Sequence, residues 1–315
     1  MKKLNIHILK HEQIGSVEHN IVKAATKRGH TVTIVDPLRI LYGKKQTKRD
    51  TPDIILARPE LSSLTEPVFA AYVTYLTEYK NKNVPVLNGL HFIIMGQDKY
   101  LTHIEVDRYF KEQNIVTNIN PETYVSFDKG MAEVQALKLV ERDESCVIKK
   151  PDSGRGEGVF HVTNERELRL LLHSFDKHEP IMMQKTIEKE KKLKNRYRDI
   201  RIIVSRDAKT LNPVVEKAYY RNGPQNSFLT NLSRGGKITK YETIDKKLCE
   251  FASHVLEAVE GDFAGIDFVR DIHGIYYFEE VNVSFEISDQ SEKIVGTQIW
   301  QNVVDFLEAK AAVKS

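Results

Sequence analysis

The amino-acid sequence predicts an α/β protein that begins with a parallel sheet and ends with an antiparallel one. Over the first hundred residues, short apolar runs alternate with helical patterns, which is typical of parallel strands joined by helical crossovers. In the middle of the chain, a glycine-rich loop at 150–159 joins two short apolar runs. Near the end, the apolar runs 264–269 and 275–282 flank the polar turn 270–274, which is the pattern of a β-hairpin.

The N-terminal elements are marked by apolar runs and by residues that begin or end helices. Ser16 can cap a helix, and Gly29 can end it because glycine accepts the left-handed conformation common after a helix. No GxGxxG motif follows the first strand, so we do not expect a dinucleotide site there. The basic segment 42–51 is interpreted as a solvated loop, with a basic lip over an acidic substrate as the alternative. The predicted strands cover 4–9, 31–35, 53–57 and 84–87, and the predicted helices cover 16–28 and 62–79.

The rest of the chain predicts two further groups of strands and helices. The first group surrounds the glycine-rich loop, and the second contains the hairpin and a closing helix. The predicted strands of these groups cover 121–125, 146–150, 159–162, 181–187, 199–204, 214–219, 264–269 and 275–282. The predicted helices cover 98–113, 132–139, 166–175, 246–260 and 297–312.

Composition excludes several classes of protein. The 47 basic and 44 acidic residues give a net charge of +3, which does not predict a nucleic-acid binder because such proteins need a concentrated basic face. The two cysteines, Cys146 and Cys249, have no CxxC spacing, so we expect neither a disulfide framework nor a zinc site. The apolar start at 4–9 is too short for a signal peptide, and no run approaches the ~20 residues of a membrane span. We therefore expect a cytoplasmic protein with no membrane partner.

The hairpin carries the first candidate site. Its two strands would bring Asp267 beside Glu280 and Asn282, and the latter two share one strand face because they are two residues apart. Carboxylates clustered within apolar strands are unfavourable unless a positive charge neutralises them. Mg²⁺, which oxygen ligands and nucleotide phosphates can hold, would supply that charge. The alternative is a hairpin with exposed acids on one face.

The glycine-rich loop carries the second candidate site. Gly154, Gly156 and Gly158 alternate with other residues, so the loop can adopt conformations closed to most side chains and expose successive N–H groups to a phosphate. Lys149 and Lys150, at the end of the preceding strand, add positive charge. The loop lacks the GK[ST] ending of a P-loop. The alternative is a glycine-rich hairpin turn without a ligand.

Two further polar segments are less specific. Asp199 and Arg201 are two apart on a predicted strand, so they share one face, and ion pairing with a neighbouring strand is the alternative to a ligand contact. Asn231 and Arg234 lie in a polar turn rich in hydrogen-bond donors, which could hold an anion. Arg221 stands at the end of the strand before that turn.

Taken in order, these segments resemble the ATP-grasp ligases over nearly the whole chain, and the RimK-like amino-acid ligases in particular. The ordered set is specific although each short motif is not. The matching segments are Asp98-Lys99, VIKKP with its glycine loop, Met183-Gln184-Lys185-Thr186-Ile187, Asp199-Ile200-Arg201, the NLSRGG turn at 231–236, Gly265-Ile266-Asp267 and Glu280-Val281-Asn282.

The resemblance implies an ATP-dependent carboxylate–amine ligase. A carboxylate would be phosphorylated to an acylphosphate, and an amine would then displace phosphate to form an amide. Mg²⁺ on the phosphates would lower the charge repulsion that opposes attack by a carboxylate. The alternatives are an ATP-grasp kinase that phosphorylates a small-molecule hydroxyl, and a nucleotide-binding regulator. The implied partners are small-molecule or peptide acids and amines, and a homo-oligomer is compatible with this assignment.

The resemblance also implies a role for each candidate residue. The Mg²⁺ ligands would be Asp267, Glu280 and Asn282, holding two ions, with Mn²⁺ as the alternative metal. The ATP contacts would be Lys99, the pair Lys149 and Lys150, the three loop glycines, the segment Gln184, Lys185 and Ile187 at adenine, Asp199 and Arg201. The residues around the transferred phosphoryl group or the substrate carboxylate would be Arg201, Arg221, Asn231 and Arg234.

The same resemblance predicts the domain organisation and shows where this chain departs from the family pattern. It implies a pre-ATP-grasp domain at 1–95, a lid subdomain at 96–190 and a C-terminal subdomain with the Mg²⁺ site at 191–315. Lys185 stands where the family commonly has a glutamate, and Leu229 where it often has an arginine. The segment Val283-Ser284-Phe285-Glu286 replaces the usual small-residue, proline and glycine sequence, so we expect altered substrate specificity.

Overall fold

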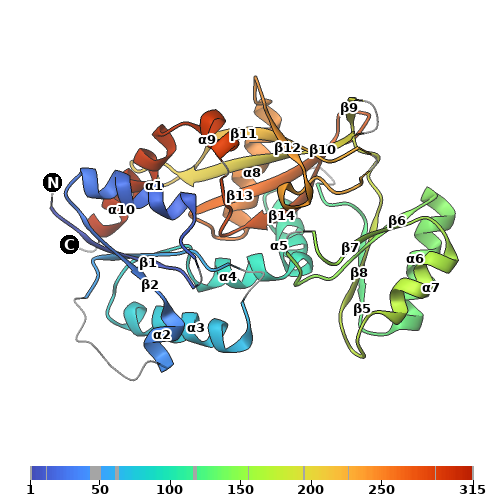
Figure 1. The fold of residues 1–315 in the computed structure, drawn as a ribbon, viewed down its shortest axis with the longest axis horizontal. Coiled ribbons are helices and arrows are strands. Elements are labelled where there is room, and N and C mark those ends of the chain that lie inside the picture. Colours follow the sequence, from blue (N-terminus) through green and yellow to red (C-terminus); the bar gives the residue numbers. More distant parts are fainter. Residues whose placement is uncertain are drawn as a thin grey trace.

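The fold of the chain combines one parallel sheet with two antiparallel sheets. The computed structural model describes residues 2–11, 13–42, 51–60, 64–115, 119–154, 156–193, 196–225, 227–287 and 289–313. Within those residues the sheets have the strand orders β2-β1-β3-β4, β5-β8-β6-β7 and β12-β11-β10-β13-β14, and β9 pairs with β10. Figure 1 shows the second sheet projecting to one side of the body formed by the other two. The predicted fold class is confirmed.

The parallel N-terminal sheet is covered by helices on both faces. The residues of β1 and β3 are almost all buried, because helices pack against both faces of these strands. Arg28 caps α1, and Gly29 follows with φ +84°, as the glycine predicts. The strands are β1 (Asn5–Leu9), β2 (Thr31–Val35), β3 (Ile54–Ala57) and β4 (Val86–Leu87), and the helices are α1 (Ser16–Lys27), α2 (Pro37–Tyr42) and α3 (Glu66–Asn81).

The second sheet and two helices form a small two-layer unit with its own apolar core. The helices α6 and α7 cover one face, where Ala132, Ala136, Leu168 and Leu172 pack against the strands. Asn164 begins α7, since its side chain accepts a hydrogen bond from the N–H of Glu167. The strands are β5 (Thr123–Ser126), β6 (Cys146–Lys149), β7 (Val159–Val162) and β8 (Ile181–Lys185), and the helices are α6 (Lys129–Asp143) and α7 (Glu165–His173).

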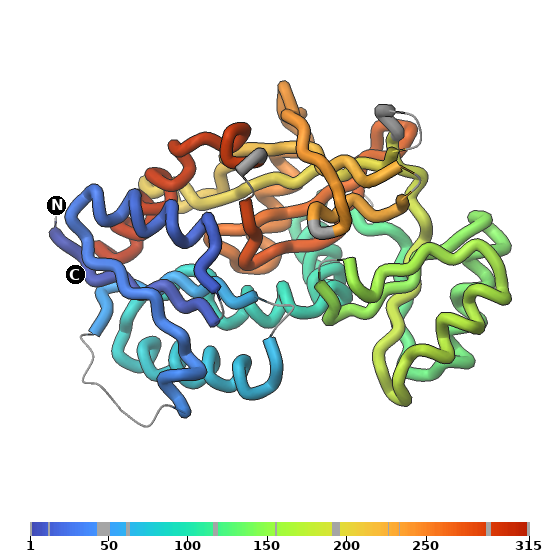
Figure 2. Tube along the Cα trace, viewed as in Figure 1, coloured from blue at the N-terminus to red at the C-terminus, as the bar shows by residue number. Residues whose placement is uncertain are grey.

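The C-terminal sheet has β10 at its centre. The strands are β9 (Lys191–Leu193), β10 (Arg196–Arg206), β11 (Pro213–Asn222), β12 (Lys237–Lys240), β13 (Phe263–Arg270) and β14 (Tyr276–Asn282). The helices near it are α4 (Leu90–Gln97), α5 (Lys99–Glu112), α8 (Lys246–Ala258), α9 (Asp289–Val295) and α10 (Gln298–Ala312), with the 3-10 turn η2 (Leu232–Arg234). In the tube view of Figure 2, the red C-terminal helix returns beside the blue N-terminal segment, where α10 packs against α1.

The alternation of residues along β10 divides this sheet into an apolar and a polar face. Ile200, Ile202 and Val204 join the large apolar cluster that includes α8. Residues of odd number point to the other face. There Ile203 packs with the N-terminal sheet and α10, whereas Asp199 and Arg201 remain polar and buried. The polar half of this face is where the candidate site lies.

Several elements differ from the sequence-based prediction. The helix α4 was not predicted because its sequence, LHFIIMGQ, is apolar almost throughout and has no helical periodicity. The short strands β9 and β12 and the helices α2 and α9 were also not predicted. The strand predicted over 84–87 is reduced to the two residues of β4. Residues 43–50 of the basic segment and residues 62 and 63 of the predicted helix lie outside the described residues.

The three sheets fall within the three predicted domain segments, 1–95, 96–190 and 191–315, and the domain limits themselves stay a prediction. The helix α5 packs against α8 and β14 of the C-terminal sheet. Across the residues that the structure describes, no helix has the length and apolar character needed to cross a membrane.

Candidate active site

The glycine loop lies next to the start of α5. Asp98 caps this helix, and its carboxylate accepts hydrogen bonds from the N–H groups of Tyr100 and Leu101 at 2.7 and 3.0 Å. The cap fixes the position of Lys99 at the first helical residue. The ammonium group of Lys99 donates to the carbonyl oxygens of Ser153 and, at 3.3 Å, of Pro151. Lys99 therefore contacts the backbone of the predicted phosphate loop.

Two glycines of the loop have conformations that require glycine. Gly156 and Gly158 have φ values of +74° and +71°. At Gly156 a β-carbon would lie 2.6 Å from Oδ1 of Asn231 and 3.4 Å from Nε of Arg234. The loop thus packs closely against the polar turn at 231–234, which belongs to the C-terminal sheet. This contact joins two of the segments singled out from the sequence.

The lysine pair before the loop divides between two environments. Lys149 is only 7% exposed and lines a cavity between the second and third sheets. Lys150 forms an ion pair with Glu179 at 2.6 Å and lies over the ring of Phe175, so it contacts the segment between α7 and β8 instead. Adjacent residues of a strand point to opposite faces. Lys149 is therefore the member of the pair that faces the cavity.

That cavity, which we call the nucleotide cavity, also contains the predicted adenine segment. Gln184 is buried, and its side-chain amide donates to the hydroxyl of Thr123 at 2.9 Å. Lys185 forms an ion pair with Asp143 at 3.4 Å. The side chains of Gln184 and Lys185 thus contact residues of β5 and α6, and both residues line the cavity together with Ile187. The loop glycine Gly156, Asp199, Arg221, Asn231 and Glu280 line it as well.

The hairpin brings the three predicted metal ligands together. Asp267 pairs with Glu280 across β13 and β14, and the Asn282 amide nitrogen lies 3.3 Å from Oδ2 of Asp267. The register shifts at this point, so Glu279 is an extra residue in β14. As a result Glu279 and Glu280, although adjacent, both line the nucleotide cavity.

The arginines predicted to bind substrate are engaged with buried carboxylates. Arg201 donates two hydrogen bonds to Asp267 at 2.7 and 2.6 Å. Arg221 donates two to Asp199, each 2.7 Å long, and a third to Asp267 at 2.8 Å. Thr230 also donates to Asp199. The ion pairing considered as an alternative is present, and it is buried within the sheet face.

Electrostatic shifts show that negative charge is crowded at the hairpin. Burial raises the pKa of Glu280, and the charge of Asp267 raises it further. For Asp267, burial acts in the same direction, but the charges of Arg201 and Arg221 outweigh it and lower the pKa. A carboxylate of raised pKa beside an ionised one is the arrangement that a divalent cation relieves. Glu280 and Asn282, which line the cavities, therefore fit a cation such as Mg²⁺. Asp267 is fully buried, lines neither cavity and accepts hydrogen bonds from Arg201, Arg221 and Asn282.

The donor set is small and needs other ligands to complete a metal coordination shell. No group of three His, Cys, Asp or Glu side chains with metal-binding geometry occurs among the described residues. Asp267, Glu280 and Asn282 supply two carboxylates and one carboxamide. Mg²⁺ commonly takes one or two carboxylates and completes its six positions with water and substrate phosphates. The hairpin matches that mode of binding.

Two charged residues of the nucleotide cavity were missed by the sequence interpretation. Lys189 is buried, donates to Glu279 at 3.1 Å and lies over the ring of Phe228. Burial lowers the pKa of Lys149 to about 8, with Glu279 opposing that shift and Lys189 and Lys99 adding to it. Glu279 could have been found only from the bulge, because strict alternation assigns it to the opposite face from Glu280.

A second cavity continues from the first toward the N-terminal sheet, and we call it the substrate cavity. It is lined by Arg201, Arg221 and Asn282 of the C-terminal sheet, and by Glu60 and Glu286. Gly154 lines it from the glycine loop. The residues that line both cavities are Lys99, Ser153, Arg221, Asn231 and Glu280. Arg234 is exposed and lines neither, although it lies beside Gly156.

Comparison with known proteins identifies the family. The model of the RimK-like ATP-grasp domain matches residues 118–307. The alpha-aminoadipate–LysW ligase LysX of Saccharolobus solfataricus is 28% identical over 271 residues, covering 84% of this chain and 87% of that protein. A probable alpha-L-glutamate ligase of Aliivibrio salmonicida is 25% identical over 321 residues, covering 99% of this chain and 97% of that protein.

Solved structures share the fold. The ATP-grasp ligase PsnB, solved with its minimal precursor, superposes with a TM-score of 0.66 at 13% identity and covers 96% of this chain and 98% of its own. The RimK domain protein of Sphaerobacter thermophilus has a TM-score of 0.65 at 15% identity, with the same coverage of both chains. The family match, the curated relatives and the fold agree: this chain belongs to the RimK-like ATP-grasp family and is an ATP-dependent carboxylate–amine ligase.

Proposed function

We propose that the nucleotide cavity and the substrate cavity hold ATP and an acid substrate, and that the acid is an amino acid or a peptide. The observation that carries this proposal is the junction of the two cavities at five shared residues. A ligand in each cavity would meet beside Glu280, Arg221 and Lys99. Phosphoryl transfer requires the reacting groups to lie close and in line, so adjoining cavities suit that step.

The reaction would proceed in two displacements. A carboxylate oxygen of the acid attacks the γ-phosphorus of ATP, and ADP leaves. The nitrogen of the amine then attacks the carbonyl carbon of the acylphosphate, phosphate leaves with the carboxylate oxygen, and the amine loses a proton. In the first step negative charge moves from the carboxylate to the leaving ADP, and in the second it develops on the carbonyl oxygen and then on the leaving phosphate. Buried cationic groups that already point at these positions stabilise such charge.

The proposed nucleotide contacts follow the lining of the cavity. Lys149 and Lys99 would bind phosphates, with the backbone of Gly154, Gly156 and Gly158 above them as a lid. The strand end at Gln184, Lys185 and Ile187 would bind adenine through its main chain, because the side chains of Gln184 and Lys185 are engaged by Thr123 and Asp143. Lys150 forms an ion pair with Glu179, so we do not assign it a contact with ATP. Asp199 would act through Arg221.

The metal site is proposed at the hairpin. Asp267, Glu280 and Asn282 would hold Mg²⁺, with two ions as the expected number and Mn²⁺ as the alternative. Structures of PsnB contain Mg and ADP, which supports a magnesium–nucleotide site in this fold. When bound, the metal supplies charge neutralisation for the attack on phosphorus. The chain supplies the oxygen ligands, and Arg201 keeps Asp267 ionised.

The acid substrate would lie against Arg221 and Asn231, with Arg201 and Arg234 nearby. Arg201 and Arg221 each use two or more donors on protein carboxylates, so they would present their remaining N–H groups to the ligand. Relatives support the substrate class. LysX is named as a ligase of alpha-aminoadipate and LysW, and PsnB was solved with a precursor peptide.

A substrate panel tests this function. Purified protein with Mg²⁺ and ATP is combined with amino acids, dipeptides and peptide tails as acids, and with amines in a matched grid. We expect phosphate release that requires both an acid and an amine, and a product whose mass is their sum less one water. ADP formation with a polyol alone would instead identify the kinase alternative. Nucleotide binding without turnover on any combination would identify the regulator.

A further inference from the structure

The bulge in β14 is supported from outside its own sheet. Glu279 is the extra residue of the bulge, because the register of β14 on β13 steps past it. Its carbonyl oxygen lies 3.1 Å from Nε2 of His103, which belongs to α5. The N–H of Phe278 donates to the carbonyl oxygen of Ile119 at 2.8 Å. Contacts from α5 and from Ile119 therefore support the backbone of the bulge.

His103 acts as a hydrogen-bond donor to this carbonyl. A carbonyl oxygen only accepts, so Nε2 of His103 carries the hydrogen. Burial lowers the pKa of His103 to about 3, with the charge of Lys149 adding to the shift, so the imidazole is neutral and Nδ1 carries no hydrogen. Within the residues that the structure describes, Nδ1 has no hydrogen-bond partner. The bond to Glu279 is therefore the polar contact that orients this buried ring.

The same ring also packs against an aromatic neighbour. His103 is 3% exposed, and its ring centroid lies 5.1 Å from that of Phe278. An apolar side chain of similar size could supply that packing, whereas only a donor can supply the hydrogen bond to the bulge. The two contributions can therefore be separated by substitution.

The bulge decides which side chains of β14 face the nucleotide cavity. Glu279 and Glu280 are adjacent, yet both line this cavity, because the extra residue breaks the alternation of the strand. Glu279 accepts a hydrogen bond from Lys189 at 3.1 Å. Without the bulge, regular alternation would turn one of the two carboxylates away from the cavity. The conformation of the bulge thus sets the position of Glu280, a proposed metal ligand.

The helix α5 connects this bulge with the glycine loop. Lys99 and His103 are four residues apart, so they lie on the same face of the helix. Lys99 donates to the carbonyl oxygens of Pro151 and Ser153, and His103 donates to that of Glu279. One helix therefore contacts two parts of the proposed nucleotide site through its side chains.

We propose that His103 is a positioning residue for the metal site. Its hydrogen bond to the carbonyl oxygen of Glu279 holds the bulge in the conformation that turns Glu280 toward the bound metal and nucleotide. His103 lines neither the nucleotide cavity nor the substrate cavity, so it acts through the backbone of Glu279. This inference rests on the proposed function, because it takes Glu280 as a metal ligand.

Calorimetry on the full chain tests the inference with the non-hydrolysable ATP analogue AMPPNP, titrated with Mg²⁺ and without metal. The ratio of the two affinities reports how strongly the protein holds the metal. His103→Leu removes the donor and keeps an apolar side chain. We expect its ratio to fall by about tenfold, or to unity if the wild-type ratio is below ten, as loss of a group that orients a metal ligand implies. Its affinity for metal-free AMPPNP should stay within about threefold of wild type.

His103→Gln is the rescue variant, because its terminal amide nitrogen can donate from near the position of Nε2. We expect its ratio to stay within about threefold of wild type. Phe110→Leu is the matched control for lost packing, because Phe110 is buried on the same helix against Phe251 of α8. It should lower the melting temperature and keep the wild-type ratio. If His103→Leu does not fold, His103→Asn takes its place, since its amide is too short to reach the carbonyl, and the same loss is expected.

Three results would overturn the inference. They are a wild-type ratio in the variant without the donor, a ratio in His103→Gln as low as in that variant, and a loss of metal-free AMPPNP affinity as large as the loss with Mg²⁺. Failure of the proposed function is distinguishable. Wild-type protein that releases no phosphate with any acid and amine would refute the ligase assignment, and a wild-type ratio of one would refute the metal site together with this inference.

Discussion

Glu280 lies beside Asp267 at the crowded end of the hairpin, so its negative charge is both unfavourable in the ligand-free protein and useful with a metal bound. The raised pKa of Glu280 expresses that repulsion. This raised pKa allows a role of Glu280 as a metal ligand to be distinguished from a role in stability. A residue retained for stability would weaken the fold when neutralised, whereas a metal ligand would not.

We predict that Glu280→Gln lowers turnover by about two orders of magnitude or more, because charge neutralisation by a metal contributes several kcal/mol to such reactions. The melting temperature of the ligand-free variant should not fall, since the substitution removes a repelled charge. Steady-state rates and thermal melts measure both effects, with Glu242→Gln as the control, because Glu242 is an exposed glutamate paired with Lys240. Wild-type turnover in Glu280→Gln would remove the metal assignment.

Lys149 gives a second prediction at the residue scale, from its lowered pKa. In the ligand-free site this pKa is about 8, against an ordinary value of 10.5. Bound phosphate favours the charged form and raises the pKa again. Nucleotide binding should therefore draw a proton from solution between about pH 8 and pH 10.5 and draw none through this group near pH 6.5.

Calorimetry of AMPPNP binding without metal, in two buffers of different ionisation enthalpy, measures this proton uptake. We expect uptake of up to one proton at pH 9 and its loss in Lys149→Met. Lys150→Met is the matched control, because Lys150 contacts Glu179 outside the cavity. Equal uptake in Lys149→Met would show that another group takes the proton.

Sequence reasoning at this scale found residues whose spacing fixes their relation and missed those that depend on irregular geometry. Glu280 and Asn282 were predicted to share a face, and both line the substrate cavity. Glu279 was missed because the bulge at Asp267 breaks the alternation. The choice between Lys149 and Lys150 could not be made, because a sequence shows that adjacent residues face apart but not which face carries the cavity.

The glycine loop is the element whose contacts we expect to change when nucleotide binds. Lys99 donates to the carbonyl oxygens of Pro151 and Ser153 in this loop, and the phosphate contact proposed for Lys99 would replace those hydrogen bonds. We predict that the backbone amides of residues 152–154 and 156–159 exchange hydrogen faster without AMPPNP than with it, because alternating glycines have a high entropy of ordering. Hydrogen exchange by mass spectrometry measures this, with β10 as an internal reference. Equal protection in both states would contradict the prediction.

Gly156 allows a sharper test of the same element. Its φ of +74° and its approach to Asn231 both oppose a side chain. We predict that Gly156→Ala lowers kcat/KM by about tenfold or more, while unfolding free energy falls by only ~1 kcal/mol, since the loop is local. Gly89→Ala is the control, because Gly89 has φ −60° and a β-carbon on it would meet nothing within 4 Å. Equal activity in the two variants would exclude a role for the loop conformation.

Element boundaries were predicted well where periodicity or capping residues are strong. The helix starting after Asp98 and the hairpin strands are examples. The helix α4 was missed because its apolar sequence has no polar face, and β12 because four residues give too little pattern. Both are formed through tertiary packing, which overrides local preference.

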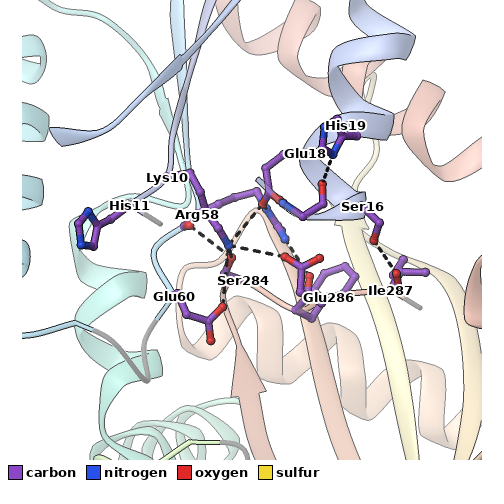
Figure 3. A network of polar contacts seen from close by, with 12 residues as sticks. Lys10, His11, Ser16, Glu18, His19, Arg58, Glu60, Ser284, Glu286 and Ile287 are labelled. Carbon is purple, nitrogen blue, oxygen red and sulfur yellow. Dashed lines mark hydrogen bonds and ion pairs between the residues drawn. The ribbon is translucent and has the colours of Figure 1, made fainter. Parts of the chain in front are cut away.

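At the scale of the whole molecule, three sheets converge on two adjoining cavities. The second sheet supplies Lys149 and the glycine loop, and the third supplies Glu280, Asn282, Arg201 and Arg221. The N-terminal sheet reaches the substrate cavity through Glu60 and through the network of Lys10 and Arg58 shown in Figure 3. Sequence reasoning predicted the parallel N-terminal sheet, the antiparallel C-terminal sheet and the strands around the glycine loop. It did not predict this network, because the Lys10–Ser284 and Arg58–Phe285 hydrogen bonds join residues more than 200 positions apart.

Transfer of oxygen from the acid to phosphate tests the central claim most directly. The acid and amine identified by the substrate panel are used, with the carboxylate of the acid labelled with oxygen-18. If the carboxylate attacks the γ-phosphorus, one labelled oxygen per turnover appears in the released inorganic phosphate, and the nucleotide product is unlabelled ADP. Mass spectrometry of the products measures both. Label in AMP, or unlabelled phosphate accompanying amide formation, would contradict the account.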